Sequence, residues 1–430
     1  MSLKSKSLIL SSLLVIGAAF PTAAHAASCQ PTKQLASPNI AQLHVEVLNA
    51  NTGQTLLAIN ENQAERSASV MKVLTAAVAL DVLGPDHKVT TNVFSDPQNP
   101  GRIYLVGSGD VTLSRMPGNI TSYYAKAPKL DTLTRLISEW SQRTGNTVTE
   151  VFIDTSLYGS DTEWHATWSK RGLTDGYMAA VSALQIDAGR LTSSRNDLVW
   201  LAKRTATPVK QAGELFIKSL NKRGIAVGLV ATEAKLPTGA QVIASVESRP
   251  MSEWIANMLR VSDNSLAEAL GRLSLIKAGF EPKMQNLTAL YKRVLSARGV
   301  DSSKIKIVDA SGLSSENAVP VAVVNDVLAL VNQGAGDYGY LKAGLPVSGE
   351  KGSLRTRFAT GNLKAAKGLV AAKTGYISSG YSLAGYLTAR DGTPLIFTVY
   401  NLSPKAKLTQ RNAMDNLVYR FYQCGANLTN

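Results

Sequence analysis

A run of apolar, alanine-rich residues from Val70 to Leu80 constrains the fold of this chain more than any other stretch. Alanine and leucine favour a helix, and a helix without a polar face has to be covered on most sides by other elements. Ser69 lies at the start of this helix, and Lys72 lies three residues further on the same face. We therefore expect a buried helix that carries a serine and a lysine at its N-terminal end.

The serine and the lysine have two interpretations. A serine hydroxyl becomes a nucleophile when a neighbouring base takes its proton, and a lysine whose charge is disfavoured by burial can be that base. Alternatively, Ser69 only caps the helix, and Lys72 extends its amine to water. The pattern S-x-x-K is too short to decide between these interpretations, so the rest of the chain has to decide.

Residues 1–26 have the pattern of a secretory signal peptide. Two lysines precede an apolar stretch from Leu8 to Phe20, and Ala24-His25-Ala26 has the small residues of a cleavage site. The apolar stretch is too short for a membrane span, and no later stretch is long and apolar enough. We expect cleavage after Ala26 and an exported protein without a transmembrane segment, periplasmic in a Gram-negative source and secreted otherwise.

The net charge of the chain is strongly positive. It is +14 for the 430 residues, and removal of residues 1–26, with two lysines and no acidic residue, lowers it to +12. A basic exported protein suits an anionic cell wall or peripheral contact with a membrane, but a charge set by solubility fits equally well. The basic residues are scattered and form no nucleic-acid-binding module, so nucleic acid is not an expected partner.

The only cysteines, Cys29 and Cys424, lie near the two ends of the mature chain. In an oxidising compartment we expect a disulfide that ties the N-terminal segment to the last helix. Lipidation of Cys29 is a weaker alternative, because Ala26-Ala27-Ser28 lacks the large apolar residue that lipoprotein signals usually carry.

The remaining pattern divides the mature chain into two domains. Alternating residues predict a hairpin over 43–59 and a series of strands over 368–400, and a helix over 411–422 follows. A further strand is predicted over 304–308. Between the predicted hairpin and the later strands, residues 93–247 have the pattern of an inserted α+β domain. This region has predicted helices over 130–145 and 209–223 and a predicted strand over 227–231. We expect one discontinuous domain, 27–92 and 248–430, interrupted by 93–247.

Two further short motifs follow the serine–lysine pair. Ser262-Asp263-Asn264 lies on a turn between two predicted helices, and Ser265 with Glu268 predicts a capping box at the start of the second. Lys373-Thr374-Gly375 lies on a strand that leads into a hairpin. Alone, each motif fits a helix cap or an ordinary strand end. Together the three match the S-x-x-K, S-D-N and K-T-G set of serine penicillin-recognising enzymes.

The spacing of the motifs narrows the resemblance. In class A β-lactamases the first two motifs are close in sequence, whereas here residues 93–247 separate them. This layout resembles the D-alanyl-D-alanine carboxypeptidase/endopeptidase family, the class C low-molecular-mass penicillin-binding proteins. The resemblance implies an α+β, serine β-lactamase/DD-peptidase-like transpeptidase fold, an antiparallel sheet flanked by helices, with a large α+β insertion between the first two motifs. The insertion looks shorter than in the longest members, so we expect a reduced subdomain near 155–200.

The resemblance also implies catalytic roles. Ser69 would be the acylated nucleophile, and Lys72 would be its general base, kept neutral by the nearby charge of Lys373. Ser262 would relay the proton to the leaving amine, and Asn264 would hold both Lys72 and the substrate amide.

Substrate-binding roles follow from the last motif. Lys373 and Thr374 would bind the terminal carboxylate, beside Gly375, and the backbone N–H groups of Ser69 and Tyr376 would form the oxyanion hole. Tyr376 stands where the family usually has serine or threonine, which leaves Thr374 as the hydroxyl donor. Asp154 and Arg357, which lie outside that motif, are candidates for contacting the stem peptide, with surface salt bridges as the alternative.

The implied activity is that of a serine D,D-carboxypeptidase or D,D-endopeptidase. It would hydrolyse D-Ala-D-Ala termini or D-Ala–meso-diaminopimelate cross-links of peptidoglycan stem peptides through an acyl-enzyme, without a cofactor, and β-lactam antibiotics would acylate the same serine. We expect no metal, because His44, His87 and His165 lack ligand spacing. The alternatives are a serine β-lactamase, although no E-x-x-L-N stretch supplies the class A base, and a non-catalytic peptidoglycan-binding protein.

Overall fold

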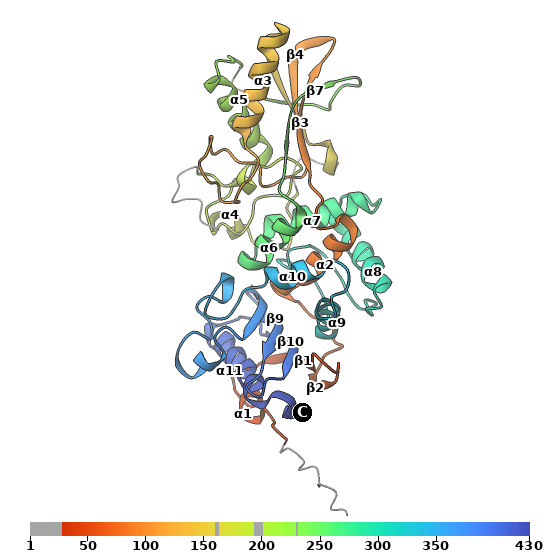
Figure 1. The fold of residues 1–430 in the computed structure, drawn as a ribbon, viewed down its shortest axis with the longest axis vertical. Coiled ribbons are helices and arrows are strands. Elements are labelled where there is room, and N and C mark those ends of the chain that lie inside the picture. The colour runs from red at the N-terminus through yellow and green to blue at the C-terminus, as the bar shows by residue number, and fades with distance from the viewer. Residues whose placement is uncertain (1–27, 160–162, 193–200, 229–230) are drawn as a thin grey trace, which may run out of the picture.

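The computed structural model describes residues 28–159, 163–192, 201–228 and 231–430. The expected signal peptide, 1–26, lies outside the described residues. Figure 1 shows a sheet at each end of the long axis, with helix α2 (Met71–Leu83) and its neighbouring helices between them. The α+β fold that we expected is confirmed.

The first sheet combines strands from both ends of the chain. It is antiparallel and has five strands in the order β2-β1-β10-β9-β8. The strands are β1 (Gln42–Asn49), β2 (Thr55–Ile59), β8 (Val370–Ile377), β9 (Gly380–Thr388) and β10 (Pro394–Leu402). This arrangement confirms the predicted hairpin and the predicted strand series, and it leaves β8 at an edge of the sheet.

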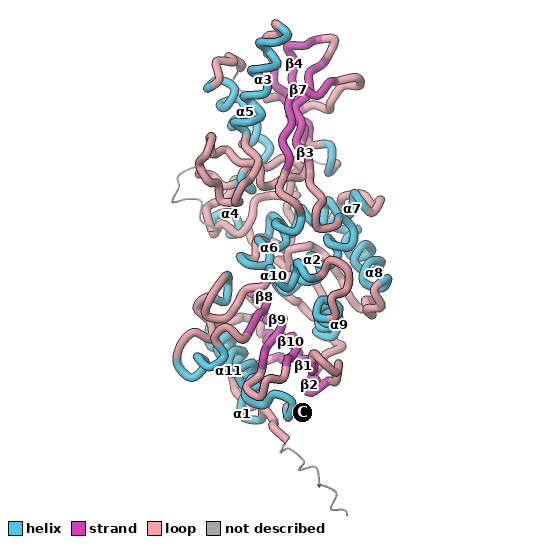
Figure 2. The backbone as a smooth tube through the Cα atoms, in the orientation of Figure 1, coloured by secondary structure: helices cyan, strands magenta, loops and turns pink. Residues whose placement is uncertain are grey.

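Both faces of this sheet are covered by helices, because successive side chains of a strand point to opposite faces. Phe397 of β10 packs in one hydrophobic cluster with Phe421 of α11 (Leu408–Cys424). Ile396, its neighbour in sequence, packs in the other cluster with Val327 of α9 (Val321–Asn332). Figure 2 shows α11 beside the strands at this end of the molecule.

Helix α2 lies at the centre of the molecule. Its residues from Met71 to Leu80 are all buried, which confirms the buried helix expected from its composition. The helices around it are α6 (Met251–Val261), α7 (Asn264–Lys277), α8 (Leu287–Ala297), α9 and α10 (Gly339–Gly344). The described residues also form two short helices, α1 (Thr32–Leu35) and α4 (Arg171–Thr174).

The second sheet has its own hydrophobic core. Its five strands have the order β6-β5-β4-β3-β7, and β4 pairs in parallel with β5. The strands are β3 (Thr90–Asp96), β4 (Asn99–Val106), β5 (Glu150–Asp154), β6 (Thr232–Glu233) and β7 (Gln241–Glu247). The amphipathic helices α3 (Leu130–Thr144) and α5 (Pro208–Lys222) pack on it through residues such as Leu133 and Phe216.

Three local predictions were wrong. The strand expected over 304–308 is reduced to one isolated bridge between Lys306 and Ala318. Residues 227–228 of the strand expected over 227–231 are irregular, and β6 begins at Thr232; residues 229–230 lie outside the described parts of the chain. The capping box of Ser265 and Glu268 is absent, because α7 begins earlier and Asp263 caps it by accepting from the Leu266 N–H.

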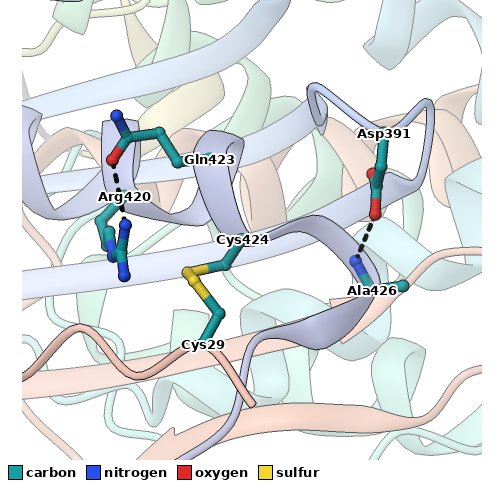
Figure 3. Close-up of a disulfide and its surroundings, with 6 residues drawn as sticks. All are labelled: Cys29, Asp391, Arg420, Gln423, Cys424 and Ala426. Atoms are coloured by element: carbon teal, nitrogen blue, oxygen red, sulfur yellow. Dashed lines mark hydrogen bonds between the residues drawn. A yellow bond between two sulfur atoms is a disulfide. The ribbon is translucent and has the colours of Figure 1, made fainter. Parts of the chain in front are cut away.

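The two ends of the described chain are joined by a disulfide between Cys29 and Cys424, with an S–S distance of 2.04 Å (Figure 3). Cys424 ends α11, so the bridge ties the N-terminal segment to the last long helix, as expected. Within the described residues, no helix has both the length and the apolar character needed to cross a membrane.

Candidate active site

The serine–lysine pair lies where a short 3-10 turn passes into α2. Ser69 is in the turn Ala68–Val70, and Lys72 is in the first turn of α2. The Lys72 amine is fully buried, and it donates to three oxygens: Ser69 Oγ at 3.0 Å, Asn264 Oδ1 at 2.7 Å and the carbonyl of Ser311 at 2.5 Å. The amine is therefore fixed against the serine hydroxyl.

Burial lowers the pKa of Lys72 to about 8, although the negative charges of Asp309, Glu268 and Asp263 act in the opposite direction. Burial also lowers the pKa of Lys373 well below its usual range, and the charge of Lys72 adds to that effect. The sequence led us to expect that Lys373 would keep Lys72 neutral. Desolvation is instead the main cause for both amines.

The second motif sits between α6 and α7. Ser262 follows the end of α6 in a left-handed conformation, with φ 62°. Its Oγ accepts from Lys373 Nζ at 2.9 Å, and the same amine donates to the carbonyl of Thr374 at 2.7 Å. Asn264 accepts from Lys72 and donates from Nδ2 to the carbonyl of Tyr177 at 3.2 Å. Each polar side chain of this turn thus contacts one lysine: Asn264 contacts Lys72, and Ser262 contacts Lys373.

Strand β8 runs close to Ser69. A Cβ atom at Gly375 would lie 2.0 Å from Ser382 Oγ and 3.0 Å from the backbone nitrogen of Ser69, so only glycine fits there. Thr374 Oγ1 lies 2.7 Å from Ser353 Oγ, a partner that the motifs did not identify. The edge strand and the serine backbone therefore meet at one point, where two N–H groups can converge on an oxyanion.

A cleft of about 700 Å³ opens at this point. Its floor includes Ser69, Ser262, Asn264 and Thr374, and the buried amines of Lys72 and Lys373 lie beneath them. Its walls include residues from between 93 and 247, which we call the second-sheet region, and residues from the last third of the chain, among them Trp164, Trp168, Asp175, Arg357, Tyr376, Tyr381 and Arg411. The ring of Tyr376, which is 54% exposed, lies 4.8 Å from the ring of Tyr381. The cleft therefore offers both aromatic and charged contacts beside the serine.

The two candidates for stem-peptide contacts have different positions. Arg357 lines the cleft and forms a buried ion pair with Asp415. Asp154, at the end of β5, accepts from the backbone N–H groups of Ser156 and Leu236 and is not part of the cleft wall. Among the described residues, the acidic residue that does line the cleft is Asp175, whose carboxylate lies 3.4 Å from the Arg171 guanidinium.

The second-sheet region also donates hydrogen bonds to residues that lie next to the floor of the cleft. Tyr124 donates its hydroxyl to Asp263 at 2.9 Å, and Trp168 donates Nε1 to Asp309 at 2.7 Å. Asp309 belongs to the loop whose Ser311 carbonyl accepts from Lys72. These contacts join residues more than a hundred positions apart, and no local pattern in the sequence indicates them.

Among the described residues, no group of histidines, cysteines and carboxylates could hold a metal ion. His44 is buried on β1, and its Nδ1 lies 3.2 Å from the carbonyl of Asn60. His165 Nδ1 lies 2.7 Å from Thr167 Oγ1. Both side chains have local structural contacts.

Sequence comparisons identify relatives along most of the chain. The model of the D-Ala-D-Ala carboxypeptidase 3 (S13) family matches residues 30–200 and 191–421. A carboxypeptidase of Mycobacterium tuberculosis is 32% identical over 396 residues, which cover 91% of this chain and 82% of the relative. Carboxypeptidase DacB of Mycolicibacterium smegmatis is 31% identical over the same shares of the two chains.

Solved structures share the fold. Penicillin-binding protein 4 (DacB) of Haemophilus influenzae has a TM-score of 0.73 at 19% identity, over 91% of this chain and 99% of that chain. A predatory peptidoglycan endopeptidase of Bdellovibrio bacteriovorus has a TM-score of 0.50 at 17% identity, over 87% of this chain and 90% of that chain.

Proposed function

Because this chain belongs to the D-Ala-D-Ala carboxypeptidase 3 (S13) family, we propose that it is a serine D,D-peptidase acting on peptidoglycan stem peptides. It would cleave D-Ala-D-Ala termini, D-Ala–meso-diaminopimelate cross-links, or both. The observation that carries this proposal is the contact of the buried Lys72 amine with both Ser69 Oγ and Asn264 Oδ1 at the floor of an open cleft.

Ser69 is the proposed nucleophile, and Lys72 is the general base. With a pKa of about 8, roughly a tenth of Lys72 is neutral at pH 7 and can accept the hydroxyl proton. Ser69 Oγ then bonds to the carbonyl carbon of the penultimate D-alanine. The developing negative charge on the carbonyl oxygen faces the backbone N–H groups of Ser69 and Tyr376, which Gly375 allows to approach each other.

Ser262 and Lys373 complete the proposed first half of the reaction. The C–N bond breaks as the leaving amine receives a proton through Ser262, which Lys373 contacts at 2.9 Å. Lys373 and Thr374 face the terminal carboxylate of the leaving group, where a cation and a hydroxyl suit a small anion. Water then attacks the ester on Ser69, releases the shortened peptide and returns the proton to the serine. A β-lactam would form the same ester and leave slowly.

The remaining proposals concern organisation and place. The domain division into 27–92 with 248–430, and 93–247 as an insertion, is supported by the second sheet, which runs from Thr90 to Glu247. A reduced subdomain near 155–200 is supported by the single α-helix, the four-residue α4, among the described residues there; 160–162 and 193–200 lie outside them. The disulfide supports an exported enzyme, periplasmic in a Gram-negative source, whose positive charge favours an anionic wall or membrane surface.

Labelling with a fluorescent penicillin tests the central proposal. The wild type should form a stable adduct, and Ser69→Ala should form none. Product analysis on a D,D-cross-linked muropeptide and on a pentapeptide then measures the two activities separately. Rapid turnover of nitrocefin would favour a β-lactamase instead. Peptidoglycan retention without labelling of the wild type would favour a non-catalytic binding protein.

A further inference from the structure

Two residues of helix α7, one turn apart, are linked to the Lys72 amine, one directly and one through the backbone of Ser311. Asn264 accepts directly from the Lys72 amine at 2.7 Å. Glu268, four residues later, accepts from the backbone N–H of Ser311 at 2.9 Å. The carbonyl of Ser311 accepts from the Lys72 amine at 2.5 Å. The backbone of Ser311 is therefore held between the Glu268 carboxyl and the lysine that contacts the serine.

We propose that Glu268 is a positioning residue for the general base: it fixes the backbone of Ser311 and, through that carbonyl, holds the Lys72 amine against Ser69. Glu268 touches neither the substrate nor the reacting atoms in this role. The inference rests on the proposed function, in which Lys72 takes the proton of Ser69.

The surroundings of Glu268 argue against a purely structural role. The sequence assigned it to a helix cap, but Asp263 caps α7, and Glu268 is only 2% exposed. Its Oε2 atom has no hydrogen-bond partner among the described residues. A buried carboxyl with an unpartnered oxygen lowers the stability of a fold, and methionine or leucine would fill the space without that cost. What these residues cannot supply is an acceptor for the Ser311 N–H.

The electrostatic environment suits an acceptor without charge. Glu268 faces Asp309 from the adjoining loop, Arg272 from its own helix, Tyr158 from the second-sheet region and Lys72 from α2. Burial, reinforced by the charge of Asp309, raises the pKa of Glu268 to about 8. A neutral Glu268 keeps its hydrogen bond to Ser311 and adds no negative charge, which would hold Lys72 in its protonated form.

Asp309 has a different role in the same loop. Its carboxylate accepts from the N–H groups of Gly312 and Ser314, from Asn317 Nδ2 and from Trp168 Nε1. These donors match the acceptor capacity of an ionised carboxylate. Asp309 thus shapes the loop with a satisfied charge, while Glu268 fixes the one residue of the loop that accepts from Lys72.

The test compares two substitutions of similar size. Glu268→Met fills the volume without an acceptor, and Glu268→Gln keeps an oxygen for the Ser311 N–H. The measurement is the acylation rate constant at saturating fluorescent penicillin, together with the apparent affinity before acylation. We expect Glu268→Met to slow acylation at least about tenfold with little change in affinity, since small displacements of reacting groups have such effects. Glu268→Gln should stay within about threefold of the wild type.

A second measurement separates positioning from loss of structure. In Glu268→Gln, the midpoint of the rise in acylation rate with pH should lie at or below that of the wild type, because no charge can form beside Lys72. Ser274→Ala is the matched control on α7, since its buried hydroxyl has no partner among the described residues. It should react like the wild type, and thermal unfolding confirms that each protein is folded.

Two results would overturn the inference. The first is a folded Glu268→Met whose acylation rate constant lies within about threefold of that of the wild type. The second is a Glu268→Gln whose acylation rate constant is lower by about tenfold or more. The second result decides the question even if Glu268→Met does not fold. Ser69→Ala distinguishes these failures from failure of the proposed function. If Ser69→Ala is still acylated, the nucleophile is wrong; if it is inert while Glu268→Met reacts normally, only the positioning role is wrong.

Discussion

The two sheet regions contribute to the cleft in different ways. The first sheet and the central helices supply the groups proposed to react or to bind substrate, with Ser69 in the turn before α2, Lys72 in the first turn of α2 and Lys373 on β8. The second-sheet region supplies hydrogen bonds to the residues that hold those groups. Tyr124 contacts Asp263, Trp168 contacts Asp309, and the carbonyl of Tyr177 accepts from Asn264.

The two regions therefore differ in how strictly the type of each side chain is determined. A group that exchanges a proton or forms an ester has to be one particular residue type at one place. A group that only fixes a neighbour needs a donor or an acceptor within reach, which several side chains or the backbone can provide. We therefore expect large effects from substitutions of the reacting groups in the first region and smaller ones from substitutions of the side chains of the second region that fix their neighbours.

The largest effect should come from Lys72→Met. Methionine fills the space of the lysine methylene chain but cannot accept the serine proton, so acylation by penicillin should slow by roughly 10³-fold, within the usual range for a lost general base. Stopped-flow or quenched labelling measures the rate. Lys218→Met on the exposed face of α5 is the control and should have no effect. Acylation of Lys72→Met at more than a tenth of the wild-type rate would mean that another group takes the proton.

The next effect is the pH dependence of acylation. Only the neutral amine of Lys72 is a base, and its pKa is lowered to about 8. The rate constant should therefore rise about tenfold per pH unit on the acidic side and level off near pH 8. Penicillin labelling between about pH 5.5 and 9 tests this profile. The range extends roughly two units below the pH at which the rate constant should level off. A flat profile over that range contradicts the assignment of Lys72 as the base.

A smaller effect should follow from Tyr124→Phe in the second-sheet region. The substitution removes the donor to Asp263, which caps α7 immediately before Asn264. Loss of one hydrogen bond of this kind should slow acylation by about three- to tenfold. Tyr104→Phe on β4 is a matched control, because Tyr104 stacks on Phe152 away from the cleft. If Tyr124→Phe slowed acylation as much as Lys72→Met, the proposed difference between reacting groups and groups that fix a neighbour would be wrong.

The smallest effect on acylation is expected from opening the disulfide. With Cys29→Ser and Cys424→Ser, the rate constant should stay within about twofold, because the bridge lies away from the residues that line the cleft. The free energy of unfolding should fall by about 2–4 kcal/mol. Denaturant unfolding, with the penicillin labelling repeated on the folded protein, checks both parts. A strong loss of acylation would show that the first sheet transmits strain to β8.

Much of the site could be predicted because its chemistry is concentrated in three short stretches. The helix, the turn and the strand that carry them follow from local periodicity, and the structure places them in contact. Asp154 and Glu268 show where this approach ends. Asp154 is the last residue of β5, and its carboxyl accepts from the N–H groups of Ser156 and Leu236, while Asp175, the residue after α4, lines the cleft.

Glu268 shows the second limit. The spacing from Ser265 fits a capping box, but Asp263 precedes it and caps the same helix, so Glu268 lies one turn inside. A three-residue spacing cannot distinguish these two registers, and the partner of Glu268, Ser311, is distant in sequence. The contacts of Tyr124 and Trp168 are equally distant. Such contacts depend on tertiary packing, which a single sequence does not encode in any local pattern.

The pairing of β1 with β10 has a consequence for the order in which the molecule forms. Gln42 lies opposite Leu402, and Asn49 lies opposite Leu395, so the middle of the first sheet needs both ends of the chain. Closing so long a loop carries a larger entropic cost than any closure within the second sheet, where β3 and β4 are neighbours in sequence and the longest closure joins Thr90 to Glu247. We predict that the second sheet is assembled first. Pulse-labelling hydrogen exchange should show protection of β3 and β4 amides before those of β1, and simultaneous protection would contradict this order.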